Sequence, residues 1–202
     1  MIQTKELIYE YEKRDEEGNI IGMKRAIDGV DIDIPEGSFV AILGHNGSGK
    51  STLAKIIAGI EKPTAGQILF DGEDITDWDI TKRAQAGISF AFQQPVRFKG
   101  ITVTDLIRIA AGGTKLSTNG VCKYLSEVGL CAADYVNREV DASLSGGELK
   151  RIEIATIIAR EATKLAVFDE PEAGIDLWSF GSLISVFENL YQKIKGNILI
   201  IS

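Results

Sequence analysis

A glycine-rich stretch, GHNGSGKST at Gly44–Thr52, has the residue types and spacing of a phosphate-binding loop. It fits the pattern G-x-x-x-x-G-K-S and lies between an apolar strand-like run and a helix-like run, as that motif requires. Glycines without a Cβ let backbone N–H groups turn toward phosphate oxygens, and the first turn of the following helix supplies further unpaired N–H groups. The stretch therefore predicts a site for the phosphates of a nucleotide.

The loop residues have distinct expected roles. We expect Lys50 to reach the β- and γ-phosphates, Ser51 to offer its hydroxyl to Mg²⁺, and Thr52 to hydrogen-bond the α-phosphate. ATP and Mg²⁺ are the ligands that this chemistry implies. The residues predicted to contact the nucleotide here are Gly44, Asn46, Gly47, Ser48, Gly49, Lys50, Ser51 and Thr52.

Two adjacent acids follow the apolar run Leu165–Phe168. Because α/β folds bind ligands at the carboxyl ends of their strands, Asp169 and Glu170 are expected beside the phosphate loop. We expect Asp169 to hold Mg²⁺ together with Ser51, and Glu170 to polarise an attacking water. The pair predicts hydrolysis of ATP.

A second glycine-rich helix start occurs at Ser145–Glu148. The sequence S-x-x-E fits a capping box, but two glycines are poor residues for a helix's first turn unless a phosphate must come close. One pocket already has the helix that begins at Lys50, so a second such helix is most useful against the nucleotide of a neighbouring subunit. The predicted contacts are Ser145, Gly146, Gly147 and Glu148.

Two further side chains are candidates for the site. Gln93 follows the predicted strand Ile88–Phe92, where an amide can sense Mg²⁺ or water; Gln94 is its less favoured neighbour. Tyr11 could stack on adenine, with Tyr9 as its competitor. A packing or strand-edge role is the alternative for either tyrosine.

Strand and helix patterns alternate along most of the chain, which predicts an α/β fold with a mostly parallel sheet. An antiparallel strand pair is expected at the N-terminus, with a turn over Glu10–Asn19. The expected strands are Ile2–Tyr11, Arg25–Ile34, Ser38–Leu43, Gly66–Asp71, Ile88–Phe92, Leu165–Phe168 and Ile198–Ile201. The expected helices are Lys50–Ile60, Ile80–Ala86, Val103–Ala111, Val121–Val128, Gly146–Arg160 and Ser179–Lys195.

Strand patterns disappear between Gln93 and about Asp141, which predicts a helical insertion. The expected organisation is one nucleotide-binding domain over 1–202. Residues 1–92 and 142–202 would form its core and an N-terminal β subdomain, and 93–141 its helical subdomain.

Composition argues against non-specific nucleic-acid binding and against direct insertion into a membrane. The 202 residues include 29 acidic and 22 basic side chains, a net charge of −7 that argues against non-specific binding to nucleic acid. No apolar run approaches the roughly 18 residues of a membrane span, so any membrane role is expected to come through a partner. We expect a cytoplasmic protein, peripheral to a membrane at most.

The phosphate loop, Gln93, LSGGE, LAVFDE and AGID (Ala173–Asp176) occur in the order seen in ATP-binding-cassette ATPases, which the whole chain resembles. The resemblance implies the P-loop fold of that family and a head-to-tail dimer with two ATP molecules between phosphate loop and opposing signature. It implies that Asp176 lies at the dimer interface. The signature departs from many transporters at Glu148, where they have Gln.

The family also has a switch histidine after its last strand, followed by a small lobe. The sequence stops at Ser202 and contains neither. We expect either a fragment lacking the C-terminal end of the domain, or a chain whose hydrolysis is impaired.

Different parts of the chain resemble two different subfamilies. The first third is similar to the ATPases of energy-coupling-factor importers. From about Asp74 on, the chain resembles the ATPases of SUF-type iron–sulfur cluster assembly, a mixture that suggests a chimera or a recombinant.

Three functions follow from this resemblance. The favoured hypothesis is an ATPase that drives a soluble iron–sulfur assembly scaffold. The alternatives are the nucleotide-binding subunit of a membrane importer and a truncated ATP-binding module with little turnover. In each the second ATPase subunit is an identical chain or a paralogue, and neither cargo nor substrate is indicated.

Overall fold

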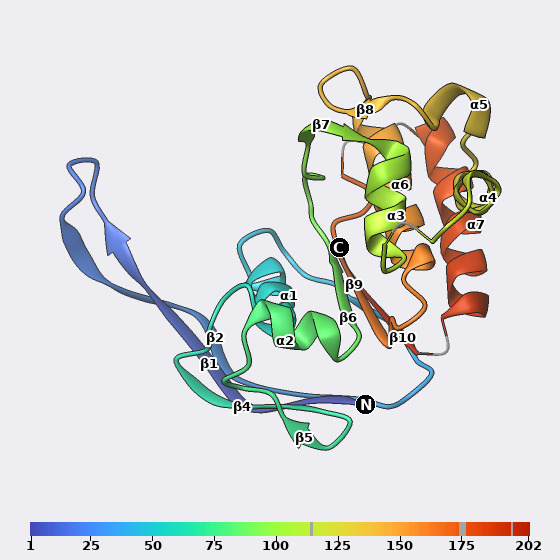
Figure 1. The fold of residues 1–202 in the computed structure, drawn as a ribbon. Helices are drawn as coiled ribbons and strands as arrows, with labels where there is room; N and C mark the ends of the chain where they lie inside the picture. The colour runs from blue at the N-terminus through green and yellow to red at the C-terminus, as the bar shows by residue number, and fades with distance from the viewer. Residues whose placement is uncertain (114, 174–176, 195) are drawn as a thin grey trace.

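The computed structural model describes residues 1–113, 115–173, 177–194 and 196–202. Two four-stranded sheets form its framework (Figure 1). One is antiparallel, with the order β2-β1-β4-β5, and the other is parallel, with the order β3-β10-β9-β6. The predicted α/β fold, with a parallel core and an N-terminal antiparallel sheet, is confirmed. The strands are β1 (Ile2–Arg14), β2 (Ile20–Ile34), β3 (Phe39–Ile42), β4 (Ala65–Phe70), β5 (Glu73–Asp74), β6 (Ile88–Ala91), β9 (Leu165–Asp169) and β10 (Asn197–Ile201).

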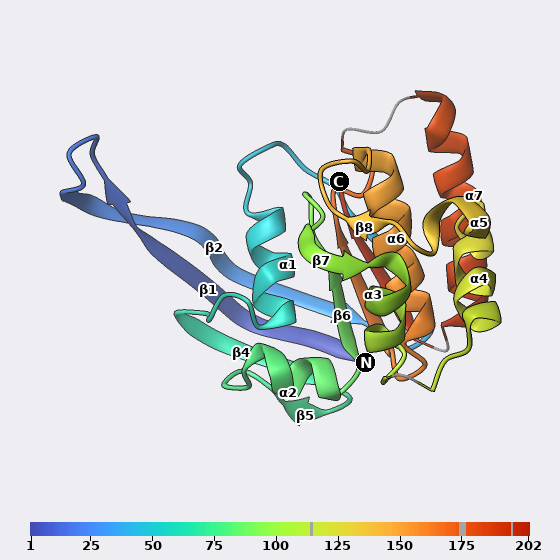
Figure 2. The same ribbon diagram turned by 45° about the horizontal axis from the view of Figure 1, so that its top comes forward.

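Helices cover both faces of the parallel sheet. In Figures 1 and 2, α1 and α2 lie on the face toward the antiparallel sheet, and α3, α4, α6 and α7 lie on the other. No helix of the described residues is long and apolar enough to cross a membrane. The helices are α1 (Lys50–Ala58), α2 (Ile80–Gln85), α3 (Val103–Ala110), α4 (Thr118–Glu127), α5 (Ala132–Tyr135), α6 (Gly146–Ala159) and α7 (Leu177–Lys193).

Strand β9 shows why the sheet is covered on both sides. Alternate residues of a strand face opposite ways, so an uninterrupted apolar run must be buried on both faces. Leu165 and Val167 pack with α1 and the antiparallel sheet. Ala166 and Phe168 pack with α3, α4, α6 and α7. The strand is therefore held from both sides, and Asp169 at its end has a fixed position.

The N-terminal hairpin is longer than predicted. The turn expected over Glu10–Asn19 is wrong for its first half, because β1 continues to Arg14 and pairs there with Ile20. Arg25 binds Glu10 across the strands at 2.7 Å, and the Asp15 carboxylate accepts the Asn19 N–H at 2.8 Å to close a shorter turn. Polar composition suggested a loop where cross-strand charge pairs instead extend the ladder. The hairpin projects beyond the rest of the molecule in Figures 1 and 2.

The segment between Gln93 and Asp141 is mainly helical, but the prediction that it has no strands is wrong. Short strands β7 (Phe98–Thr102) and β8 (Glu139–Val140) pair antiparallel at its two ends. β8 has only two residues, and β7 does not alternate apolar and polar side chains, so the pairing of the two strands is what defines them. Side chains of α3 and α4 share one hydrophobic cluster with α6 and α7. The division into a core and a helical subdomain stays a prediction.

Candidate active site

The phosphate loop joins β3 to α1, as the motif predicts. Gly49 is the residue before the helix and has φ +92°, and Gly47 has φ +80°. A Cβ at Gly49 would lie 2.3 Å from the Ala26 carbonyl oxygen of β2, so only glycine fits. Gly49 provides no side-chain cap, and the first N–H groups of α1 stay available to an anion. Asn46, Gly47 and Ser48 are exposed above this helix end, and Thr52 lies in its first turn.

Lys50 lies inside the loop. Its Nζ donates to the carbonyl oxygens of Gly44 at 2.6 Å and His45 at 2.9 Å, and the residue is only 8% exposed. A buried ammonium next to unpaired helix N–H groups forms a positive cradle. The loop therefore fits the β- and γ-phosphates of ATP.

Ser51 and Asp169 lie together although 118 positions separate them in the chain. Ser51 Oγ donates to Asp169 Oδ1 at 2.7 Å, and Asp169 is 2% exposed at the end of β9. A hydroxyl and a carboxylate oxygen beside a phosphate cradle are the donors that Mg²⁺ prefers. The residues present thus fit the predicted magnesium position.

Glu170 and Gln93 form the second pair of the site. Gln93 Nε2 donates to Glu170 Oε2 at 2.5 Å, so the residue after β9 meets a residue two positions after β6. Glu170 has φ +45°, an uncommon backbone conformation for a residue with a side chain. Its N–H donates to the Ile201 carbonyl oxygen at 2.8 Å, which fixes that conformation. Next to Asp169, this half-buried carboxylate can orient a water for attack on phosphate.

Lys150 supports the same turn from helix α6. Its Nζ donates to the carbonyl oxygens of Glu170 at 2.8 Å and Pro171 at 2.9 Å. Burial lowers the pKa of Lys150, and nearby acids, Glu172 first among them, act against that shift. Sequence reasoning missed this residue, although a lysine within the apolar face of a predicted helix was a usable signal.

The signature begins α6 with the predicted capping box. The Glu148 N–H donates to Ser145 Oγ at 3.3 Å, and the Ser145 N–H donates to Glu148 Oε2 at 2.7 Å. A Cβ at Gly146 or Gly147 would meet nothing within 4 Å. Packing against the described part of the chain therefore does not require either glycine.

The structure does not bring the signature to the chain's own phosphate loop. The start of α6 lies apart from α1 in both Figures 1 and 2. Its contact with a nucleotide held by another subunit stays a prediction. Asp176, the other residue predicted at that interface, lies outside the described residues.

Glu148 is held by two residues that sequence reasoning also missed. The Tyr135 hydroxyl donates to Glu148 Oε1, and Arg138 Nη1 lies 3.7 Å from the same oxygen. Burial alone would raise the pKa of Glu148, but the hydrogen bonds from Tyr135 and Ser145 and the charge of Arg138 outweigh it and lower that pKa. Glu148 is therefore a fixed carboxylate that ties α5 to the signature.

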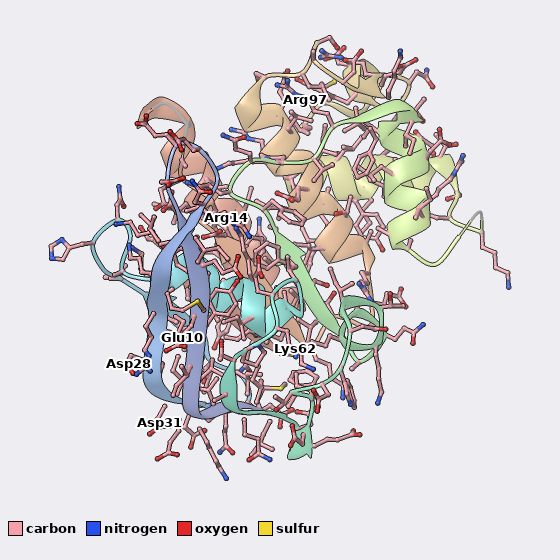
Figure 3. All side chains as sticks on the ribbon, turned by 90° about the vertical axis from the view of Figure 1, so that its left-hand side faces the viewer. Glu10, Arg14, Asp28, Asp31, Lys62 and Arg97 are labelled. Carbon is pink, nitrogen blue, oxygen red and sulfur yellow. The ribbon has the colours of Figure 1, made fainter. Side chains whose placement is uncertain are left out.

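Tyr11 lies on the hairpin beside the phosphate loop. It pairs with Lys24 on β2, close along the strand to Ala26, the residue that Gly49 touches. Tyr11 is 40% exposed, whereas the Tyr9 hydroxyl donates to Glu61 Oε2 at 2.9 Å. Figure 3 shows the same hairpin with Glu10 and Asp28, both partners of Arg25, labelled along it. The exposed ring favours Tyr11 over Tyr9 for stacking, which stays a prediction.

A family model described as ABC transporter matches residues 27–173. The chain belongs to the ATP-binding proteins of the ABC transporter family. It is 42% identical over 187 residues to an uncharacterised ABC transporter ATP-binding protein of Methanocaldococcus jannaschii, covering 89% of this chain and 74% of that protein. It is 31% identical to the energy-coupling factor transporter ATP-binding protein EcfA1 of Mycoplasmopsis pulmonis, covering 100% and 73%.

Solved structures agree with this membership. CbiO1 from Clostridium perfringens, part of the ABC transporter complex CbiONQ, has a TM-score of 0.76 and 30% identity, covering 100% of this chain and 77% of CbiO1. A dimeric post-hydrolysis ATP-binding cassette bound to ADP and Pi has a TM-score of 0.83 at 24% identity and shows the shared fold.

The ABC ATPase is thus an ATP hydrolase that binds MgATP, as the motifs predicted. These relatives do not show the predicted SUF-type assignment or the suggested chimera.

Proposed function

We propose that this ATPase is the nucleotide-binding subunit of a membrane importer of the energy-coupling-factor type. The sequence interpretation favoured a soluble iron–sulfur scaffold as partner. Relatives named as energy-coupling factor ATP-binding proteins from two bacteria, and CbiO1 of a CbiONQ complex, support the importer instead. The protein would lie on the cytoplasmic side, peripheral to the membrane through its partner.

A mostly apolar groove that reaches Phe92, the residue before Gln93, is the observation that carries this proposal. It has a volume of about 700 Å³ and lies between the ends of α1 and α3, helix α2, strand β6 and helix α6. Ile80 and Ile109 line it and are 49% and 64% exposed. Phe92, another lining residue, directly precedes Gln93. A short amphipathic helix of a transmembrane subunit would cover these side chains and press on the segment that holds Gln93.

The residues support one sequence of events. When bound, MgATP supplies the phosphoanhydride to be cleaved and a divalent cation beside it. Lys50 and the loop N–H groups bind the phosphates, Ser51 and Asp169 hold the cation, and Glu170 orients water and accepts its proton.

Two contacts of the site would reach other subunits. The turn at Ser145–Gly147 closes over the nucleotide of a second ATPase subunit and excludes water. Because Gln93 binds Glu170 and follows Phe92, a movement of Glu170 would shift the part of the groove that Phe92 lines.

Charge placed in the groove tests the partner. Ile80→Glu with Ile109→Glu should abolish co-purification with a transmembrane coupling subunit from detergent extracts, while MgATP binding stays unchanged. Ile20→Glu is the matched control, because Ile20 is 55% exposed at the far end of the hairpin. Equal capture by the groove variant and the control would contradict the proposal.

The soluble scaffold of iron–sulfur assembly is the second candidate. The stretches LSGGELKRIEIA and FDEPEAGIDLWS, which resemble the ATPases of that pathway, favour it. The same purification separates the two candidates: a partner recovered from the soluble fraction without detergent, and lost in the groove variant, would support the scaffold over the importer.

A further inference from the structure

Glu153 is a carboxylate that the ATPase mechanism does not use. Glu153 lies on α6, three positions after Lys150 and on the same face of the helix. Its Oε1 accepts the backbone N–H of Phe92 at 3.0 Å. Phe92 joins the end of β6 to Gln93. One hydrogen bond therefore links α6, the helix that begins with the signature, to the residue before Gln93.

The surroundings of Glu153 are apolar. A cavity of about 160 Å³ beside it is lined mainly by aromatic and aliphatic side chains of β6, β7, α3 and α6, among them Phe90, Phe98 and Leu106. A carboxylate placed there loses solvation, and one backbone N–H only partly compensates. Burial accordingly raises the pKa of Glu153 to about 7, with the Phe92 N–H and the charge of Lys150 acting in the opposite direction. An apolar residue would avoid the desolvation of a charge but would leave the Phe92 N–H without this acceptor, so the hydrogen bond is what the acid supplies here.

Helix α6 contacts the backbone on both sides of the catalytic pair. Glu153 holds Phe92, ahead of Gln93, and Lys150 holds the carbonyl oxygens of Glu170 and Pro171. Gln93 Nε2 and Glu170 Oε2 meet at 2.5 Å between these two supports. A shift of α6 would therefore move both members of the pair together.

We propose that Glu153 is a positioning residue of the ATPase: by accepting the Phe92 N–H it fixes Gln93 against Glu170 and couples this pair to the helix that begins at Ser145. The acceptor oxygen matters for this role, and the negative charge does not. The role rests on the ATPase activity and is independent of whether the partner is a membrane subunit or a scaffold.

Two conservative variants separate this role from a structural one. Glu153→Gln keeps an oxygen at the same reach, whereas Glu153→Asp keeps the charge but withdraws the acceptor from Phe92. Glu153→Gln should retain most of the wild-type kcat. Glu153→Asp should lower kcat about tenfold and leave KM for MgATP within about twofold, because only the alignment of the catalytic pair is lost.

Glu188→Gln, a change of an exposed acid on α7, is the control and should leave both constants unchanged. A double-mutant cycle with Gln93→Ala is the second measurement. In the Gln93→Ala background, Glu153→Asp should cause no further loss of kcat. The proposal is overturned if the aspartate variant equals the wild type or outperforms the glutamine variant. It is also overturned if KM rather than kcat changes, or if the effects of Glu153→Asp and Gln93→Ala add.

Discussion

At the scale of single residues, the site depends on charged side chains placed where water does not solvate them well. Lys50 is 8% exposed, Lys150 is 4% exposed and Asp169 is 2% exposed. Each has named oxygen or hydroxyl partners, which is the condition under which buried charges are tolerated. Glu153 accepts the Phe92 N–H in apolar surroundings that raise its pKa, and its ionisation should therefore be visible in the stability of the protein.

The pH dependence of unfolding tests that expectation. The folded-state pKa of Glu153, about 7, lies above the value of 4.5 expected in the unfolded chain. The folded state therefore binds the proton more tightly, and this contribution to stability is complete below pH 4.5 and is lost as pH rises through 7. Relative to the wild type, Glu153→Gln should gain about 1–3 kcal/mol between pH 4.5 and pH 8.

Urea titrations at several pH values measure this difference. Burial raises the pKa of Glu153, and the charge of Lys150 acts to lower it. The side chains of β6, β7, β8 and α3 that surround Glu153 are apolar. Stability curves of the two proteins that run parallel across this pH range would contradict the raised pKa.

At the scale of elements, helix α1 is held at both ends. Its first turn faces the phosphate site, and its last carbonyl groups meet Arg83 of α2. The Arg83 guanidinium donates to the carbonyl oxygens of Ile56 at 2.6 Å and Ile57 at 2.9 Å, and the residue is 1% exposed. Burial lowers the pKa of Arg83 to about 10, so the side chain is still charged at neutral pH. A cation at a helix C-terminus stabilises the helix dipole.

Removing this cation should destabilise the protein strongly. Arg83→Met leaves the α1 carbonyl groups without a donor and should lower the free energy of unfolding by roughly 2–4 kcal/mol. Lys82→Met, a change at the adjacent residue over the Trp78 ring, should cost less than about 1 kcal/mol. Urea unfolding of both variants is the measurement, and equal losses would show that the contacts of Arg83 are not what stabilises α1.

The elements that sequence predicted best are those whose pattern is local. The run Leu165–Phe168 is apolar throughout and became a strand buried on both faces, and the glycine-rich loop before Lys50 came with its own helix start. The pair Ser51–Asp169 followed from placing strand ends at one edge of a parallel sheet, whereas the hydrogen bond between Gln93 and Glu170 was found only in the structure.

The misses depend on contacts between distant segments. Strands β7 and β8 exist through their mutual pairing, and the outer hairpin through cross-strand charge pairs such as Arg25–Glu10. Lys150 and Glu153 hydrogen-bond backbone groups that are distant in the sequence, and hydrophobic periodicity does not predict such contacts. Surfaces that bind a partner are harder still to predict from sequence, because several separate segments form the groove that Phe92 lines.

At the scale of the whole molecule, the two helical layers have different tasks. The layer with α1 holds the phosphate site against the antiparallel sheet, and the layer with α6 carries the signature. A Cβ added at either glycine of the signature would meet none of the described residues within 4 Å, and the start of α6 lies apart from α1. We therefore expect one complete site to need two chains.

Sedimentation of the Glu170→Gln protein tests this central claim most directly. The variant should keep MgATP binding, lose most hydrolysis because its amide cannot accept a proton, and accumulate as a dimer with saturating MgATP but not without it. Adding Gly147→Asp should return it to a monomer that still binds MgATP, because a carboxylate would face the opposing γ-phosphate. A Glu170→Gln protein that binds MgATP and sediments only as a monomer would contradict the shared site.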